Sequence, residues 1–239
     1  MKKVVIAFLL LSGASVAAGK PKAAAPSSAA VPEKPTAAAF HAAFGKGDAV
    51  ILKKQGQLKE DVKYTPGNLV ETPFGPVLLS PGEVQNASHV NSGKLAIVYL
   101  KHSDKGFEVV KKFVPATETG SFGKIVDWSV SKSFGENPVV SVNGAGNWQG
   151  YQCSTTTLVE LTPQGPKELV TVPLTYDDSG AAAGKKATQI TGSIDNIQPG
   201  KSFDVAYIGF GLKDFTDRYV FRDGAYVLAS GGKSRMQTC

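Results

Sequence analysis

Histidine and aspartate side chains are the groups in this sequence best suited to acid–base catalysis. His89 lies in a polar loop, His102 follows an apolar run, and Asp177 and Asp178 are adjacent in the segment TYDDSG. A histidine beside a carboxylate can act as a general base, so either histidine with either aspartate is a candidate hydrolytic pair. A loop histidine is more often simply solvated, and the sequence favours a protein that is not an enzyme.

No catalytic or metal-binding motif accompanies these residues. The patterns G-x-S-x-G and H-E-x-x-H are absent, and no two of the 3 histidines have the spacing of zinc ligands. Residues 129–132 match S-x-x-K, but they lie on an alternating strand, where positions three apart face opposite ways. Adjacent loop aspartates usually start turns rather than bind Ca²⁺. The sequence therefore predicts no metal and no cofactor.

The stretch NGAGNWQG, residues 143–150, is predicted to be a hairpin loop that binds a ligand. Its glycines are spaced one residue too widely for a dinucleotide motif, and no helix follows them. An indole can stack on a sugar ring while nearby amides bond the hydroxyls. The candidate binding residues are Trp148, Asn147, Gln149 and Tyr151, with further amides from Asn143 and Gln152. The alternative is that Trp148 caps the core beside a disulfide, since large aromatic side chains are buried on average.

The 2 cysteines are predicted to form a structural disulfide. Cys153 and Cys239 lack a C-x-x-C arrangement, and a bond between them would pin the C-terminal residue. Loop-closure entropy then favours the folded chain by about 4 to 5 kcal/mol. Two free reactive thiols are the alternative.

The N-terminal residues are expected to direct export. Two lysines, an apolar run at 4–11 and small residues at 15–18 are typical of a signal peptide, predicted over 1–18. The run is much shorter than the roughly 20 residues of a membrane-spanning helix, so no stable membrane insertion is expected after cleavage. Residues 19–36 are rich in proline and alanine and are predicted to be a disordered linker. The expected location is periplasmic or secreted.

Most of the net positive charge lies outside the predicted folded part. The whole chain carries +6, whereas residues 37–239 hold 21 basic and 19 acidic residues. A nucleic-acid-binding protein should carry its charge as a patch on the folded domain, so nucleic acid is not an expected partner.

The rest of the sequence alternates between strands and turns. A short helix is expected at 36–45, capped by Thr36, and a buried central strand at 95–100. Phe107, Val109 and Phe113 are expected to share one face of the next strand, and 115–123 is expected to be a connector and sub-boundary. Strands are further predicted at 125–132, 138–143, 151–161, 167–174, 189–197, 202–210, 218–222 and 225–229.

These patterns predict an all-β domain over 37–239. Two tandem antiparallel meanders would form a β-sandwich or open barrel behind one short helix. The expected function is an exported, non-enzymatic module that binds a carbohydrate or a protein of the cell envelope. An envelope-polymer hydrolase using His89 or His102 with a loop carboxylate is the alternative.

Overall fold

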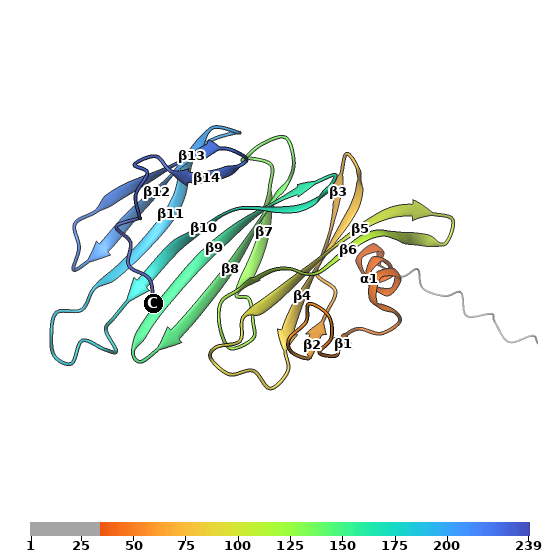
Figure 1. Ribbon diagram of the computed structural model, residues 1–239, viewed down its shortest axis with the longest axis horizontal. Coiled ribbons are helices and arrows are strands. Elements are labelled where there is room, and N and C mark those ends of the chain that lie inside the picture. The colour runs from red at the N-terminus through yellow and green to blue at the C-terminus, as the bar shows by residue number, and fades with distance from the viewer. Residues whose placement is uncertain (1–33) are drawn as a thin grey trace, which may run out of the picture. The chain divides into compact units, whose positions relative to one another are not determined.

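The computed structural model describes residues 34–239, so the predicted signal peptide and most of the predicted linker lie outside the described residues. The described chain forms one helix and two antiparallel sheets (Figure 1). The helix is α1 (Pro35–Phe44), and the strands are β1 (Val50–Leu52), β2 (Val62–Tyr64), β3 (Asn68–Thr72), β4 (Gly75–Val84), β5 (Gly93–Ser103), β6 (Gly106–Thr119), β7 (Asp127–Ser131), β8 (Val139–Trp148), β9 (Tyr151–Thr162), β10 (Gly165–Asp177), β11 (Gln189–Gln198), β12 (Ser202–Phe210), β13 (Phe215–Arg222) and β14 (Ala225–Leu228).

Helix α1 begins one residue earlier than predicted. Pro35 occupies its first turn and Lys34 is the N-cap, so Thr36 lies inside the helix and does not cap it. Proline suits this position because its fixed φ matches the helix and its missing N–H would have no partner there. The predicted pair of Phe40 and Phe44 stacks with ring centroids 4.9 Å apart, and Gly45 ends the helix with φ 97°.

The first sheet has the strand order β1-β2-β4-β5-β6, with β3 paired to β4. Strand β5 is its buried centre, as predicted, because every residue from Leu95 to Leu100 is buried. Ala96, Val98 and Leu100 pack in a cluster with Phe40 of α1, and Leu95, Ile97 and Tyr99 pack in a cluster with β8 and β9. The continuous apolar run of β5 therefore joins the helix layer to the second sheet.

Strand β6 departs from its predicted pattern at a bulge. Tyr99 pairs with Lys111 and Leu100 with Val109, which leaves Val110 as an extra residue on β6. The extra residue reverses the alternation, so Phe107 and Val109 pack in one cluster while Phe113 packs in the other, and their predicted shared face is wrong for Phe113. The strand also continues to Thr119, so residues 115–119 are not a connector. Residues 120–126 connect β6 of the first sheet to β7 of the second sheet.

The second sheet is an eight-stranded meander with the order β14-β13-β12-β11-β10-β9-β8-β7. The predicted all-β antiparallel fold is confirmed, but β10 pairs with β11, so the two predicted meanders form one sheet. Asp223 and Gly224 form the tightest predicted hairpin turn, with φ 50° and 84°, as a type I′ turn requires.

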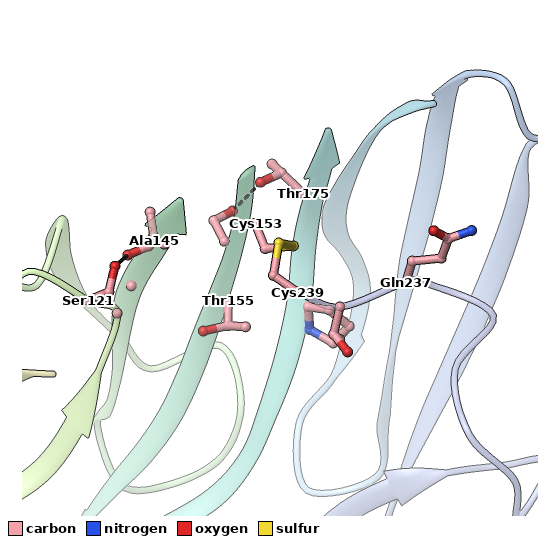
Figure 2. A pocket seen from close by; sticks show the side chains of 13 residues that line it. Ser121, Ala145, Cys153, Thr155, Thr175, Gln237 and Cys239 are labelled. Atoms are coloured by element: carbon pink, nitrogen blue, oxygen red, sulfur yellow. Dashed lines mark hydrogen bonds between the residues drawn. A yellow bond between two sulfur atoms is a disulfide. The ribbon is translucent and has the colours of Figure 1, made fainter. Parts of the chain in front are cut away.

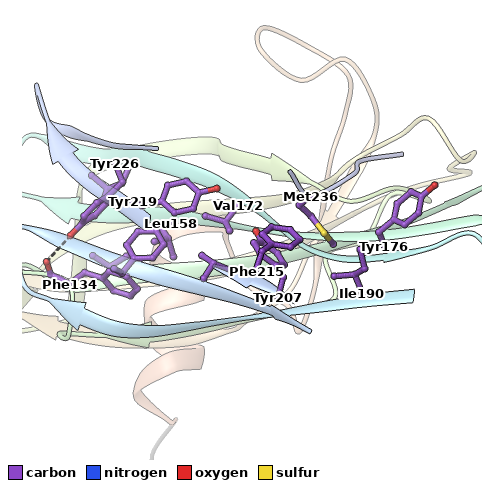
Figure 3. Packing of buried hydrophobic residues seen from close by; sticks show 14 residues of the cluster. Phe134, Leu158, Val172, Tyr176, Ile190, Tyr207, Phe215, Tyr219, Tyr226 and Met236 are labelled. Atoms are coloured by element: carbon purple, nitrogen blue, oxygen red, sulfur yellow. Dashed lines mark hydrogen bonds between the residues drawn. The ribbon is translucent and has the colours of Figure 1, made fainter. Parts of the chain in front are cut away.

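The second sheet curls into a half-barrel, and its far edge strand β14 contacts β10. Figure 3 shows aromatic and aliphatic side chains gathered within the curl, among them Tyr207, Tyr219 and Tyr226, and Phe203 belongs to the same buried cluster. Phe203 stacks on Tyr219 at 4.9 Å and meets Tyr226 edge-on at 5.0 Å. The Tyr207 hydroxyl donates to the carbonyl of Pro173 at 2.8 Å, which ties β12 across the curl to β10.

Tyr64→Phe is expected to leave the free energy of unfolding unchanged or to raise it by up to about 1 kcal/mol. The Tyr64 hydroxyl is buried without a hydrogen-bond partner among residues 34–239, so its removal takes away only an unfavourable desolvation. Tyr207→Phe is the matched control, because it removes the bond to Pro173 and should cost about 1 to 2 kcal/mol. Urea denaturation measures the free energy of unfolding of both variants. A larger loss in Tyr64→Phe than in Tyr207→Phe would contradict the conclusion that the Tyr64 hydroxyl has no hydrogen-bond partner.

Candidate functional site

The predicted loop at 143–150 is mostly strand. Strand β8 continues to Trp148 and β9 begins at Tyr151, so only Gln149 and Gly150 form the turn. Their φ values of 50° and 86° make it a two-residue turn of the hairpin type. Local composition suggested a loop, but pairing along the whole of β9 satisfies the backbone groups of residues 144–148.

The hairpin divides the predicted binding residues between its two faces. Trp148 pairs with Tyr151 and Asn147 with Gln152. Because side chains alternate along a strand, the aromatic pair and the amide pair project from opposite faces. The predicted combination of the indole with neighbouring amides is therefore split, and the Asn143 amide bonds the Asp127 carboxylate instead.

Trp148 lies outside the three buried clusters of the described chain and is 50% exposed. The alternative in which it caps the core does not match this exposure. One face of its indole is covered by His89, with ring centroids 4.1 Å apart. Trp148 and His89 thus join the β8–β9 hairpin to the loop between β4 and β5.

Residues 120–126 run along the edge of β8 beyond its pairing with β7. The Ser121 N–H donates to the Ala145 carbonyl at 2.9 Å, and the Val126 N–H to the Asn143 carbonyl at 2.8 Å. A Cβ on Gly144 would stand 2.3 Å from the backbone nitrogen of Gly120, so only glycine permits this approach. The glycines of the predicted loop thus serve close packing as well as the turn.

Two cavities lie over β8, β9 and β10, with volumes of about 210 Å³ and 270 Å³. Because Cys153 and Ser154 are adjacent on β9, the disulfide beside the first cavity and the Ser154–Thr175 hydroxyl pair beside the second lie on opposite faces of the sheet. The shared lining residues are Ala145, Gly146, Cys153, Ser154 and Thr175. The tail residues Gln237, Thr238 and Cys239 line the first cavity, whereas Phe122, Asn147 and Gln152 line the second, which we call the groove. Figure 2 shows the tail side, with Ser121 bonded to Ala145 and Cys239 joined to Cys153.

The residues that line this groove carry hydroxyl and amide groups. No Asp, Glu, His, Lys or Arg lines either cavity. The polar residues of the first cavity are Ser121, Thr155, Gln237 and Thr238, those of the groove are Asn147 and Gln152, and Ser154 and Thr175 line both. Ser154 and Thr175 bond each other at 2.8 Å, which orders two of the hydroxyls. Such a lining can exchange hydrogen bonds with an uncharged polar ligand, and it holds no group for acid–base chemistry.

Phe122 is the groove residue that sequence analysis missed. Its side chain is 51% exposed, and its backbone adopts φ 57° between Gly120 at 72° and Gly123 at 73°. A bulky residue in this left-handed region is uncommon and marks a position worth functional scrutiny. The sequence signal was the aromatic residue in GSFG, a segment otherwise typical of a connector.

The predicted disulfide between Cys153 and Cys239 is present and spans 86 residues of sequence. It holds the tail against β9, and further contacts support the tail. Met236 is buried in the cluster inside the curl, and the Ser234 hydroxyl donates to the Asp217 carboxylate. The tail is therefore a fixed wall of the first cavity.

The residues of the predicted hydrolytic pairs do not come together. His102 lies on β5 with Nε2 3.9 Å from the Glu71 carboxylate. Asp177 on β10 is separated from Asn147, the neighbour of Trp148, by two strand spacings, or roughly 10 Å. Within residues 34–239, His89 stacks on that tryptophan and forms no hydrogen bond or ion pair with Asp177, which bonds Ser179 and Gln189.

Both aspartates instead organise the loop after β10. Asp177 accepts hydrogen bonds from the Ser179 N–H at 2.8 Å and the Gln189 amide at 3.0 Å. The Ser179 bonds hold the pKa of Asp177 below its ordinary value, so its carboxylate stays ionised. Asp178 accepts from the Thr188 N–H at 2.6 Å. These contacts are those of turn-forming residues.

Two further properties concern residues 34–239 alone. No group of three or more His, Cys, Asp or Glu side chains within them is arranged to hold a metal ion. None of their helices has the length and apolar character needed to cross a membrane. Comparison of the chain with protein-family models, curated proteins and solved structures finds no match.

Proposed function

We propose that this protein is an exported, non-enzymatic module that binds an uncharged glycan in the groove over β8, β9 and β10. One observation carries the proposal: the groove is lined by hydroxyl and amide residues and no ionisable side chain, with the exposed ring of Phe122 at its rim. Glycans present hydroxyl groups around the edge of each sugar and a flat apolar face, which match such a lining.

The absence of carboxylates from the lining supports binding rather than hydrolysis. Glycoside hydrolases use two carboxylates, roughly 5 to 10 Å apart, on either side of the bond that is cleaved. No aspartate or glutamate lines either cavity. A pair of carboxylates on either side of a glycosidic bond is therefore missing from the lining, and Asp177, the cross-strand neighbour of Gln152, accepts hydrogen bonds from Ser179 and Gln189.

Export is part of the proposal and rests on two features. The residues at 1–18 have the composition of a signal peptide, and the cysteine pair is oxidised, which is typical of compartments outside the cytoplasm. Recovery of the chain from an envelope or culture fraction with an N-terminus near residue 19 would be the expected result. Retention of the leader on protein inside the cell would contradict it.

Phe122→Ala is expected to weaken glycan binding roughly tenfold, because it removes the stacking surface at the rim of the groove. The probe is a panel of soluble gluco-, chito- and manno-oligosaccharides, and isothermal titration calorimetry measures affinity. The melting temperature should stay nearly constant, since the ring is half exposed. Asn147→Ala combined with Gln152→Ala should weaken binding to the same ligand.

Phe221→Ala is the matched control, since Phe221 is a 37% exposed phenylalanine on β13, outside the groove. It should leave glycan affinity unchanged. Equal losses in the two phenylalanine variants, or binding of polygalacturonate in preference to every uncharged oligosaccharide, would overturn the proposal. Capture of an envelope protein with no oligosaccharide binding would do the same.

A further inference from the structure

Three apolar side chains project into solvent at one end of the second sheet. Ile208, Phe210 and Leu212 are 61%, 56% and 40% exposed. Along β12 the inward residues Phe203 and Tyr207 are buried, so the alternation places Ile208 and Phe210 on the outer face of the strand. A cluster of this kind on a surface marks a contact with another molecule or with a membrane.

Lysines border these apolar residues. The Lys186 ammonium lies 4.6 Å from the centroid of the Phe210 ring. Lys185 precedes it in the sequence, Lys213 lies in the loop between β12 and β13, and both are exposed. The loop that carries Lys185 and Lys186 rests on the end of β12, because a Cβ on Gly211 would stand 2.9 Å from the Ala187 carbonyl.

The three lysines outnumber the two aspartates, Asp178 and Asp214, of the loops 178–188 and 211–214 that carry them. Within residues 34–239 none of the three lysines forms an ion pair, and the only aromatic ring that Lys186 contacts is that of Phe210. We name the six residues Ile208, Phe210, Leu212, Lys185, Lys186 and Lys213 the β12 tip.

The neighbouring hairpin carries two more exposed aromatic side chains at this end, on the opposite face of the sheet from Ile208 and Phe210. The turns after β8, β10 and β12 all lie at the same end of the meander (Figure 1). The β8–β9 turn touches the β10–β11 loop, since a Cβ on Gly150 would stand 2.4 Å from the backbone of Gly180. Trp148 and Tyr151, 50% and 38% exposed, belong to that hairpin. Aromatic side chains with a polar edge favour the interface between membrane and water.

Charge decides between the candidate occupants of the β12 tip. A second copy of the chain, related by two-fold symmetry, would bring the same three lysines face to face and repel. An anionic lipid surface complements them and also receives apolar side chains at the boundary between headgroups and acyl chains. We propose that the β12 tip docks this protein reversibly on a bilayer surface that contains anionic phospholipid.

Co-sedimentation with lipid vesicles tests the proposal on the chain from Gly19, which retains the whole compact unit Glu33–Cys239. Vesicles of phosphatidylcholine with phosphatidylglycerol should bind the protein, and vesicles of phosphatidylcholine alone should bind it at least roughly tenfold more weakly. Raising the salt from about 0.1 M to about 0.5 M should weaken binding, because the lysine contribution is screened.

Two variants separate the apolar and the charged parts. Ile208→Ser/Phe210→Ser/Leu212→Ser should lower binding to anionic vesicles at least roughly tenfold. Lys185→Gln/Lys186→Gln/Lys213→Gln should remove most of the preference for anionic lipid and its salt dependence. The control Ile51→Ser/Val110→Ser/Val227→Ser changes side chains that are 47%, 55% and 41% exposed elsewhere, and it should bind as the unmodified chain does.

The proposal is overturned if the unmodified chain binds neither kind of vesicle, or if the apolar variant binds as well as the unmodified chain. Self-association that the apolar variant abolishes, without vesicle binding, would assign the tip to a second copy and overturn it too. The apolar variant should still bind oligosaccharides, because the β12 tip contributes no residue to the groove. Failure of vesicle binding can therefore be told apart from failure of the proposed glycan binding.

Discussion

Replacing Cys153 and Cys239 by alanine is expected to lower the free energy of unfolding by about 4 to 5 kcal/mol. The bond spans 86 residues of sequence. While it is intact, it lowers the conformational entropy of the unfolded chain and so raises the free energy of the unfolded state. The tail adds local contacts, with Met236 buried and the Ser234 hydroxyl bonded to Asp217. Loss of the bond should therefore also free the tail and open the cavity that it borders.

Urea denaturation of the unmodified chain, with and without reductant, and of the double variant measures this effect. Reductant should destabilise the unmodified chain by the same amount as the double substitution and should leave the double variant unchanged. A double variant within about 1 kcal/mol of the unmodified chain would mean that the remaining tail contacts suffice. Proteolysis near residues 229–235 should become faster in the double variant, because these residues would no longer be held at both ends.

Much of the fold is predictable because its signals are local. The boundaries of β9, β11 and β12 follow from alternation between turn residues, and the turns at Pro199–Gly200 and Asp223–Gly224 have the backbone that these residues favour. Alternation does not reveal β1 and β2, since each has only 3 residues, β1 pairs with β2, and β2 pairs with the longer β4. The bulge at Val110 depends on pairing with β5, which alternation within β6 cannot reveal.

The groove was less predictable than the fold because distant segments build it. Phe122 reaches the groove only because residues 120–126 pair with the edge of β8, and no local pattern announces that pairing. Asn147 is predicted to act with Trp148, but it lines the groove together with Phe122. Because β8 continues to Trp148, alternation places Trp148 and Asn147 on opposite faces. The glycines at 144 and 146 are untypical of a strand interior, so composition alone does not indicate this strand.

Phe203→Ala is expected to lower the free energy of unfolding by about 3 to 5 kcal/mol. The side chain is fully buried and touches Phe134, Tyr219 and Tyr226, which come from the β7–β8 loop, β13 and β14. Its removal leaves a cavity that three large rings cannot close without moving the segments that carry them. Because Tyr226 also donates to the Phe134 carbonyl at 3.2 Å, the curl of the second sheet depends on this contact group.

The control is Phe221→Ala, which removes a ring of the same size that is 37% exposed and meets Tyr226 edge-on at 5.1 Å. It should cost about 1 kcal/mol, since little apolar area leaves the interior and no closed cavity forms. Urea denaturation gives both values, and near-ultraviolet circular dichroism reports the packing of the tyrosines. If the two substitutions cost the same, Phe203 does not hold the curl, and the half-barrel must be maintained by strand pairing alone.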